Sequence, residues 1–83
     1  MPIDALQGYN AYAVTPADGS NISGAAERGF LIYVGVAGDI SVDTIGGQTA
    51  VVFKNMAAGT ILPVRVVRVR STSTTATNLV AIN

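Results

Sequence analysis

The segment Ile61-Leu62-Pro63-Val64-Arg65-Val66-Val67-Arg68-Val69-Arg70 is the longest strand candidate in the chain. It is rich in β-branched residues, and valine alternates with arginine on both sides of Val66-Val67. The repeated valine breaks the period of two, so a regular strand would move the later arginines to the other face. The pattern predicts either a β-bulge near Val66-Val67, which would return all three arginines to one side, or a barrel corner with both faces partly covered. Pro63 is tolerated near the start of the strand, where one edge is open.

Shorter strand candidates surround this segment, and turns rich in Gly, Ser or Thr separate them. They are residues 30–34, 40–43, 49–53 and 79–82. Gly46-Gly47 offers the positive-φ pair of a two-residue hairpin. Residues 25–28 are the only candidate for a helical turn. The pattern predicts an all-β fold, either a small antiparallel β-sandwich or a barrel, with an N-terminal arm.

Residues 39–43 alternate between apolar and polar side chains. Ile40 and Val42 are expected to face the core, and Asp39, Ser41 and Asp43 to lie on a solvated face. Two carboxylates four residues apart on a strand are separated by about 13 Å, which is too far for a catalytic pair. The spacing also lacks the Gly and the final acidic residue of a calcium loop. No metal site is predicted here.

The N-terminal part of the chain differs from the rest. We expect an arm over residues 1–14, with a short strand near residues 11–15, and a single β domain over residues 15–83. Met1-Pro2-Ile3-Asp4 lacks the basic and apolar regions of a signal peptide. The longest weakly polar run, residues 30–36, is far shorter than the roughly 20 residues that cross a bilayer. No membrane partner is expected.

The composition argues against an enzyme. The 83 residues contain no Cys and no His. A disulfide framework, a thiolate nucleophile, a thiol-type zinc site and the commonest general base are therefore excluded. The hydroxyls of residues 71–77 have no His or Lys nearby to activate them, and Gly35-Val36-Ala37-Gly38 lacks the Lys-Ser/Thr of a phosphate loop. No catalytic residue, cofactor-binding residue or cofactor is predicted.

A chain of this length forms only a small core, and small folds usually need additional stabilisation. Because disulfides and thiol-type metal sites are excluded, we expect a homo-oligomer or a chain bound to a larger surface. Residues 1–43 hold all five acids and one base, a net charge of −4, and residues 44–83 hold four bases and no acid, a net charge of +4. These halves pair either inside one fold or between subunits. A sequence pI near 6.0 argues against nucleic acid as a partner.

Three motifs together resemble a known family. They are Tyr33-Val34-Gly35-x-Ala37-Gly38-Asp39, Ala58-Gly59-Thr60-x-Leu62-Pro63-Val64-Arg65-Val66-x-Arg68-Val69 and Thr72-x-Thr74-Thr75-Ala76-Thr77. Over residues 15–82 the chain resembles the small spike-base head proteins of tailed bacteriophages and gene transfer agents. The resemblance implies a small β protein on the outside of a capsid, which caps a capsid position, can seat a fibre and has no enzymatic activity.

The leading hypothesis is a virion structural protein that reaches the capsid exterior from the host cytoplasm. The expected partners are sister subunits in a trimer or pentamer, the major capsid protein and a spike fibre protein. A cement protein that clamps capsomers without a fibre, and a module that binds host-surface carbohydrate, are the alternatives. Direct sugar binding is disfavoured because the chain has no Trp and three Tyr. The residues expected to contact the capsid or a neighbouring subunit are Ile3, Leu6, Tyr9, Tyr12, Arg65, Arg68 and Arg70.

Overall fold

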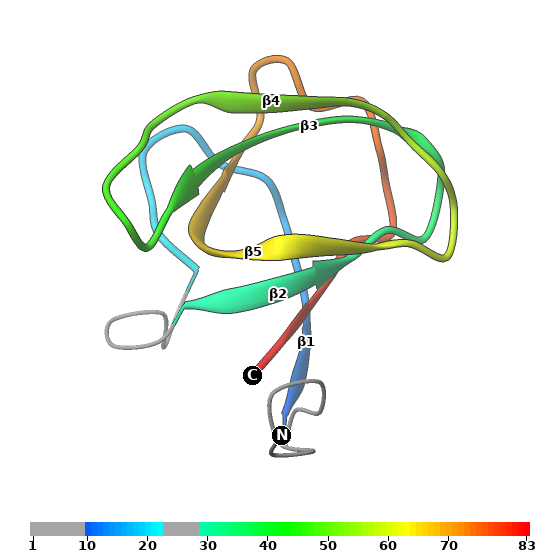
Figure 1. Cartoon of the computed structure of the whole chain (residues 1–83), viewed down its shortest axis with the longest axis horizontal. Coiled ribbons are helices and arrows are strands. Elements are labelled where there is room, and N and C mark those ends of the chain that lie inside the picture. The colour runs from blue at the N-terminus through cyan, green and yellow to red at the C-terminus, as the bar shows by residue number, and fades with distance from the viewer. Residues whose placement is uncertain (1–9, 23–28) are drawn as a thin grey trace.

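The computed structural model describes residues 10–22 and 29–83, and these residues form an all-β fold (Figure 1). The predicted fold class is confirmed. The strands are β1 (Ala11–Ala13), β2 (Phe30–Tyr33), β3 (Gly38–Thr44), β4 (Val51–Met56), β5 (Ile61–Arg70) and β6 (Val80–Ile82). No helix in the described residues is long and apolar enough to cross a membrane.

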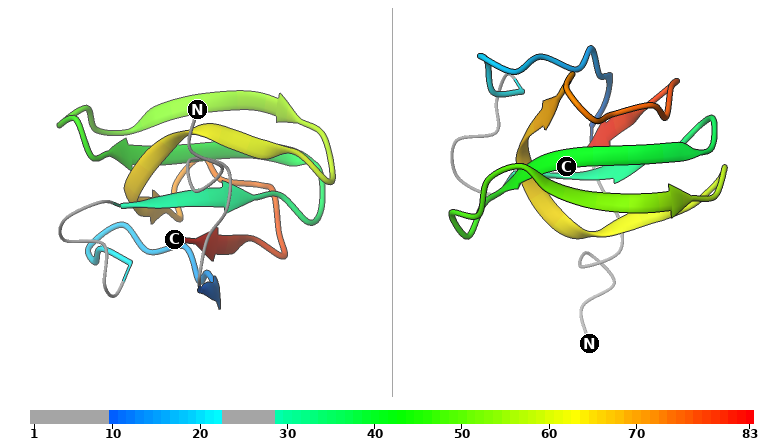
Figure 2. Two further views of the ribbon diagram at one scale, coloured as in Figure 1. Left: turned by 60° about the horizontal axis from the view of Figure 1, so that its bottom comes forward. Right: turned by 90° about the horizontal axis from the view of Figure 1, so that it is seen from above.

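The six strands form one sheet in the order β1-β6-β2-β5-β3-β4. Every neighbouring pair is antiparallel. The sheet curls round its own inner face, as the two further views in Figure 2 show. Within the described residues β1 and β4 do not pair with each other, so they remain the two edges of an open sheet.

The inner face of the curled sheet holds the hydrophobic core. Phe30 and Ile32 from β2, Ile40 and Val42 from β3, and Leu62 from β5 have no solvent-exposed surface. Their spacing of two along each strand is the alternation expected of a sheet with one covered face. Further buried members are Val34, Val66, Val69, Ala76, Leu79 and Ala81. The core therefore draws on β2, β3, β5 and β6 together.

The predicted bulge in β5 is confirmed. Asp43 of β3 lies opposite Arg68, but the next residue, Thr44, lies opposite Val66, so β5 contains one extra residue there. The extra residue allows Val66 and Val69, three apart in the sequence, both to be buried in the core. Pro63 lies in the first half of β5, where that strand pairs with β2 alone and the register with β2 is irregular.

The predicted two-residue hairpin at Gly46-Gly47 is wrong. Six residues connect β3 to β4, and of the two glycines only Gly47 has a positive φ, of 102°. Backbone and side-chain hydrogen bonds at the end of β3 hold this longer loop closed. Thr44 N–H donates to the Gln48 carbonyl at 2.8 Å, and Ala50 N–H donates to Asp43 Oδ1 at 2.9 Å. The candidate helical turn at residues 25–28 lies outside the described residues.

Candidate functional site

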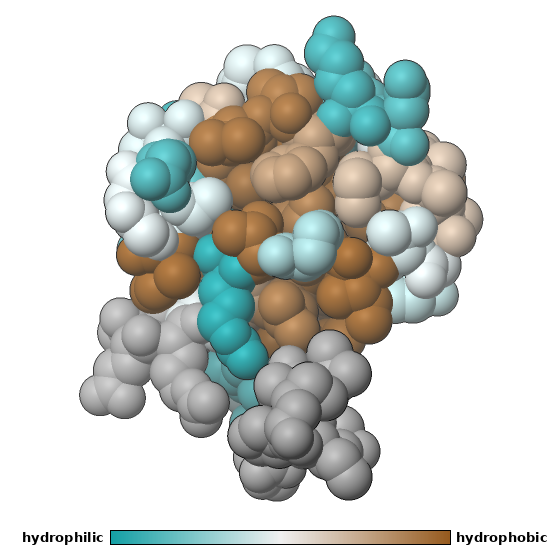
Figure 3. Space-filling model, viewed as in Figure 1, coloured by the Kyte–Doolittle hydropathy of each residue, from teal (hydrophilic) through white to brown (hydrophobic). Residues whose placement is uncertain are grey.

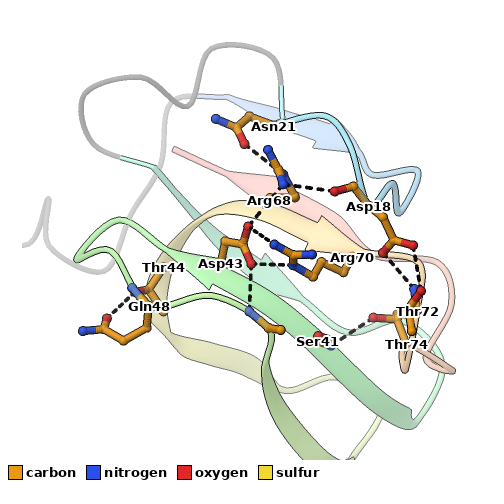
Figure 4. A network of polar contacts seen from close by, with 11 residues as sticks. Asp18, Asn21, Ser41, Asp43, Thr44, Gln48, Arg68, Arg70, Thr72 and Thr74 are labelled. Carbon is orange, nitrogen blue, oxygen red and sulfur yellow. Dashed lines mark hydrogen bonds and ion pairs between the residues drawn. The ribbon is translucent and has the colours of Figure 1, made fainter.

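Asp43 lies at the centre of a polar cluster on the outer face of the sheet (Figure 4). Its carboxylate accepts two hydrogen bonds from Arg70, at 2.7 and 3.0 Å, and lies 3.5 Å from Arg68 Nη1. The pKa of Asp43 is lowered, mainly by the hydrogen bonds from Arg70, while burial acts in the opposite direction and raises it. The same pairing raises the pKa of Arg70. The bulge at Val67 brings both arginines to this carboxylate.

Two segments cover this face of the sheet, one from residues 15–22 and one from residues 71–76. Arg68 donates to the side-chain oxygen of Asn21 and to the carbonyl of Asp18, each at 3.0 Å. Asp18 accepts hydrogen bonds from Thr72 N–H at 3.0 Å and Thr72 Oγ1 at 2.7 Å. These bonds lower the pKa of Asp18 from 3.8 to about 2. The covering segments are therefore tied to each other as well as to β5.

The expectation of a solvated face at residues 39–43 is wrong for Ser41 and Asp43, which are 2% and 6% exposed. The strand alternation is correct, but the covering segments exclude solvent from the outer face. Ser41 N–H donates to Thr74 Oγ1 at 2.9 Å, and Asp39 N–H donates to Thr75 Oγ1 at 2.9 Å. Thr74 and Thr75 therefore act as hydrogen-bond acceptors for β3. The sequence had predicted only a turn for this segment.

The predicted contact residues divide into four groups. Arg68 and Arg70 come together at Asp43, in contacts within one chain. Tyr12 is 47% exposed and its ring meets the Phe30 ring edge-on, with centroids 5.8 Å apart. Arg65 lies on β5, and its side chain makes no hydrogen bond or ion pair within the described parts of the chain. Ile3, Leu6 and Tyr9 lie outside the described residues.

An open pocket of about 300 Å³ adjoins the polar cluster. Its walls combine hydroxyl groups, a guanidinium and a carboxylate with apolar side chains of β4 and the loop before it. The lining residues are Asp18, Ser41, Ala50, Val52, Arg70, Thr72 and Ser73. No group of three or more His, Cys, Asp or Glu side chains in residues 10–22 and 29–83 could hold a metal ion. The pocket offers hydrogen-bonding groups and an apolar wall.

Apolar side chains also reach the surface. Figure 3 shows them gathered across the region between β4 and β5. Val51, Phe53 and Met56 of β4 are half-buried against the core. Tyr33 and Ile61, which lie opposite each other on β2 and β5, are 37% and 47% exposed. An exposed apolar surface rimmed by polar residues is typical of a protein interaction site.

Comparison with solved structures identifies a relative of matching size. The chain is similar to a chain in the capsid of a native gene transfer agent (GTA) particle, a structure computed with C5 symmetry. The two share 31% sequence identity with a TM-score of 0.75, and the match covers 100% of both chains. No family model and no curated protein matches the sequence.

Proposed function

We propose that this chain, which belongs to a family of capsid-related proteins of gene transfer agent particles, decorates the outside of a phage-type capsid as a head decoration or spike base. Its work there is assembly: it stabilises the head and can seat a fibre. It has no catalytic role. Its location is the capsid exterior, reached from the host cytoplasm.

The observation that carries this proposal is the full coverage of both chains in the comparison. The capsid relative therefore matches this chain over its whole length. A sheet of six strands with extents of 33 × 25 × 19 Å covers a small patch of a capsid. Such a component supports a role on top of a shell built by a larger protein.

The surface supports assembly with sister subunits, the major capsid protein and a spike fibre. The polar cluster fixes the loops over the outer face, so this side is preorganised for contact. Arg68 and Arg70 keep 23% and 25% of their side-chain surface exposed. Together with Tyr12 and Arg65, these remain the proposed contacts among the described residues. Ile3, Leu6 and Tyr9 are proposed contacts of the arm.

A cement protein without a fibre is the alternative within the same class. The capsid structure that contains the relative was computed with C5 symmetry, which is compatible with pentamers on a fivefold axis and equally with trimers placed around it. A carbohydrate-binding module has no comparable support, because the pocket beside Asp18 and Arg70 has no aromatic wall.

The first experiment measures the mass of the purified chain by light scattering after size exclusion, at two concentrations. We expect a trimer or pentamer of the 8.5 kDa chain. The oligomer is then added to capsids that lack it and located by electron microscopy. Density at the vertices alone supports a spike base, and density across the shell supports cement. A chain that stays monomeric and binds no capsid would refute the proposal.

A further inference from the structure

The two edges of the sheet suggest how copies of this chain contact each other. We propose that β4 of one copy pairs with β1 of the next, so that one antiparallel sheet continues from subunit to subunit around a ring. This inference rests on the proposed homo-oligomer and specifies the surface that forms it. It follows from three features of the edges: their free polar groups, their direction and their composition.

The first feature is the direction of the backbone polar groups on β4. Ser41 N–H donates to Thr74 Oγ1, on the β5 side of β3, so the backbone polar groups of Ser41 point away from β4 (Figure 4). Val52 lies opposite Ser41. In antiparallel sheets, residues opposite each other alternate between hydrogen-bonded and non-hydrogen-bonded pairs, and this pair is of the second type. Val52 therefore directs its own N–H and C=O to the open side of β4.

The same alternation applies to β1. Asn10 and Asn83 exchange both backbone hydrogen bonds, at 2.9 and 3.0 Å. The next pair, Ala11 with Ile82, is therefore of the non-hydrogen-bonded type. Ala11 directs its N–H and C=O away from β6, to the open side of β1. Each edge thus presents at least one residue that can exchange two hydrogen bonds with a new strand.

The second feature is strand direction. All five junctions of the sheet are antiparallel, and six strands alternate in direction, so β1 and β4 run in opposite directions. A second copy can be placed with its β1 beside β4 and its strands oriented as in the first copy. The new pair of strands is then antiparallel as well. Each copy uses two different edges, which makes the contact heterologous. A heterologous contact closes into a ring whenever its rotation divides a full turn.

The third feature is the composition of the edges. Natural proteins protect edge strands with charges, prolines or bulges. β1 is Ala-Tyr-Ala, exposed throughout and without a charge. β4 has a single charge, Lys54, and an irregular register near Asn55, whose φ is 58°. The middle of β4, where Val52 is 40% exposed, has no charge, proline or bulge. These edges are suited to pairing with a strand of another copy.

Two proline variants test the proposal. Val52→Pro and Ala11→Pro each remove an N–H that points to an open edge and makes no bond to the described residues of its own sheet. We expect each variant alone to lose the oligomer and to scatter as an 8.5 kDa monomer. The matched control, Val52→Thr, keeps the N–H and should assemble like the natural chain. Cooperative thermal unfolding of the variants checks that they fold.

Mixing the two variants makes the test specific. Val52→Pro keeps a free β1 edge and Ala11→Pro keeps a free β4 edge, so the mixture should form a capped pair of two chains and stop there. We measure it by sedimentation at the concentrations that assemble the natural chain. Folded Val52→Pro that assembles normally, a dimer of either variant alone, or a mixture without a two-chain species would overturn edge pairing. A natural chain that is itself monomeric would instead refute the oligomer on which the inference rests.

Discussion

At the scale of single residues, Asp43 is the side chain at which the hydrogen bonds and ion pairs of the outer face meet. It accepts hydrogen bonds from Arg70 on one side and from Ala50 N–H on the other, and it is 6% exposed. A buried carboxylate is stable only when its charge is compensated. The bulge in β5 brings the arginines to this carboxylate, and the loop before β4 supplies the Ala50 N–H. Asp43 therefore links the bulge to the loop.

Replacing Asp43 with Asn keeps the acceptor for Ala50 but removes the negative charge beside Arg68 and Arg70. We expect the free energy of unfolding to fall by about 2 kcal/mol, within the range for hydrogen bonds to charged groups. Urea unfolding measures the change. Asp39→Asn is the control, because Asp39 Oδ1 accepts the Asn55 N–H, which the amide also can do, and the side chain is not in an ion pair within the described residues. Equal stability of the two variants would contradict a structural role for the charge.

Asp18 makes the stability of the fold depend on pH. Its pKa is lowered from 3.8 to about 2, and that of Asp43 is lowered as well. A carboxyl group whose pKa is lower in the folded state contributes its full stabilisation above its unfolded pKa, and loses it as the pH falls through the folded pKa. The melting temperature should therefore drop between about pH 4 and pH 2. In Asp18→Asn the drop should be smaller, and an unchanged profile in this variant would contradict the assignment.

At the scale of elements, the segment of residues 71–76 packs closely against β3. A Cβ atom on Gly38, the first residue of β3, would lie 2.5 Å from the backbone nitrogen of Ala76. The contacting atom is backbone, so it cannot move aside as the end of a side chain would. This close approach accompanies the hydrogen bonds that Thr75 and Ala76 N–H donate to the Asp39 carbonyl, at 2.8 and 3.1 Å.

Gly38→Ala should therefore destabilise the fold by about 1–3 kcal/mol, as overpacking does in well-packed regions. Gly19→Ala is the matched control, since a Cβ at Gly19 would meet nothing within 4 Å. Thermal unfolding of both variants at one pH measures the difference. A Gly38→Ala protein as stable as the control would show that the segment of residues 71–76 can move away from β3 at little cost.

A second element-scale prediction concerns Thr74. Its hydroxyl accepts the N–H of Ser41, which is 2% exposed. Thr74→Val preserves the shape of the side chain but leaves that N–H without this acceptor. The expected loss is about 1–3 kcal/mol, the cost of a buried donor without a partner. Hydrogen exchange at Ser41 should accelerate more than at Val42, and exchange that is unchanged at both would contradict the prediction.

At the scale of the whole molecule, we predict that the residues before β1 are required for attachment to the capsid. β1 pairs with β6 from Ala11 to Ala13, so a truncation that spares the sheet must end before Asn10. We expect deletion of residues 1–9 to abolish binding to capsids while the melting temperature stays within a few degrees of that of the full chain. Cosedimentation with capsids that lack the protein measures binding. A truncated chain that still cosediments would remove the arm from the proposed contacts.

The strands and their inward faces follow from the sequence itself. The alternation of valine with other residues in Ile61–Arg70 predicted the strand. Its break at Val66-Val67 predicted either a bulge or a barrel corner, and the structure has the bulge. Alternation is a local property, because neighbouring side chains of a strand point to opposite faces whatever the strand packs against. The same reasoning found Ile40 and Val42, the core residues of β3. It also identified the arginines of β5 as contact residues, and it left open whether the charges pair inside one fold or between subunits; Arg68 and Arg70 pair with Asp43 inside one fold.

Only the tertiary structure decided what covers the outer face. Asp43 meets Arg70 across 27 residues of chain, and Asp18 meets Thr72 across 54. Strand periodicity states which side chains share a face, but it contains no information on which distant loops fold over that face. The prediction of a two-residue hairpin at Gly46-Gly47 failed for a related reason. The hydrogen bonds that Asp43 accepts from Ala50 N–H and that Thr44 N–H donates to Gln48 stabilise a longer loop than the glycines alone would favour. The sequence therefore determined the strands and their inner faces, whereas contacts between distant residues decided the cluster, the pocket and the two open edges.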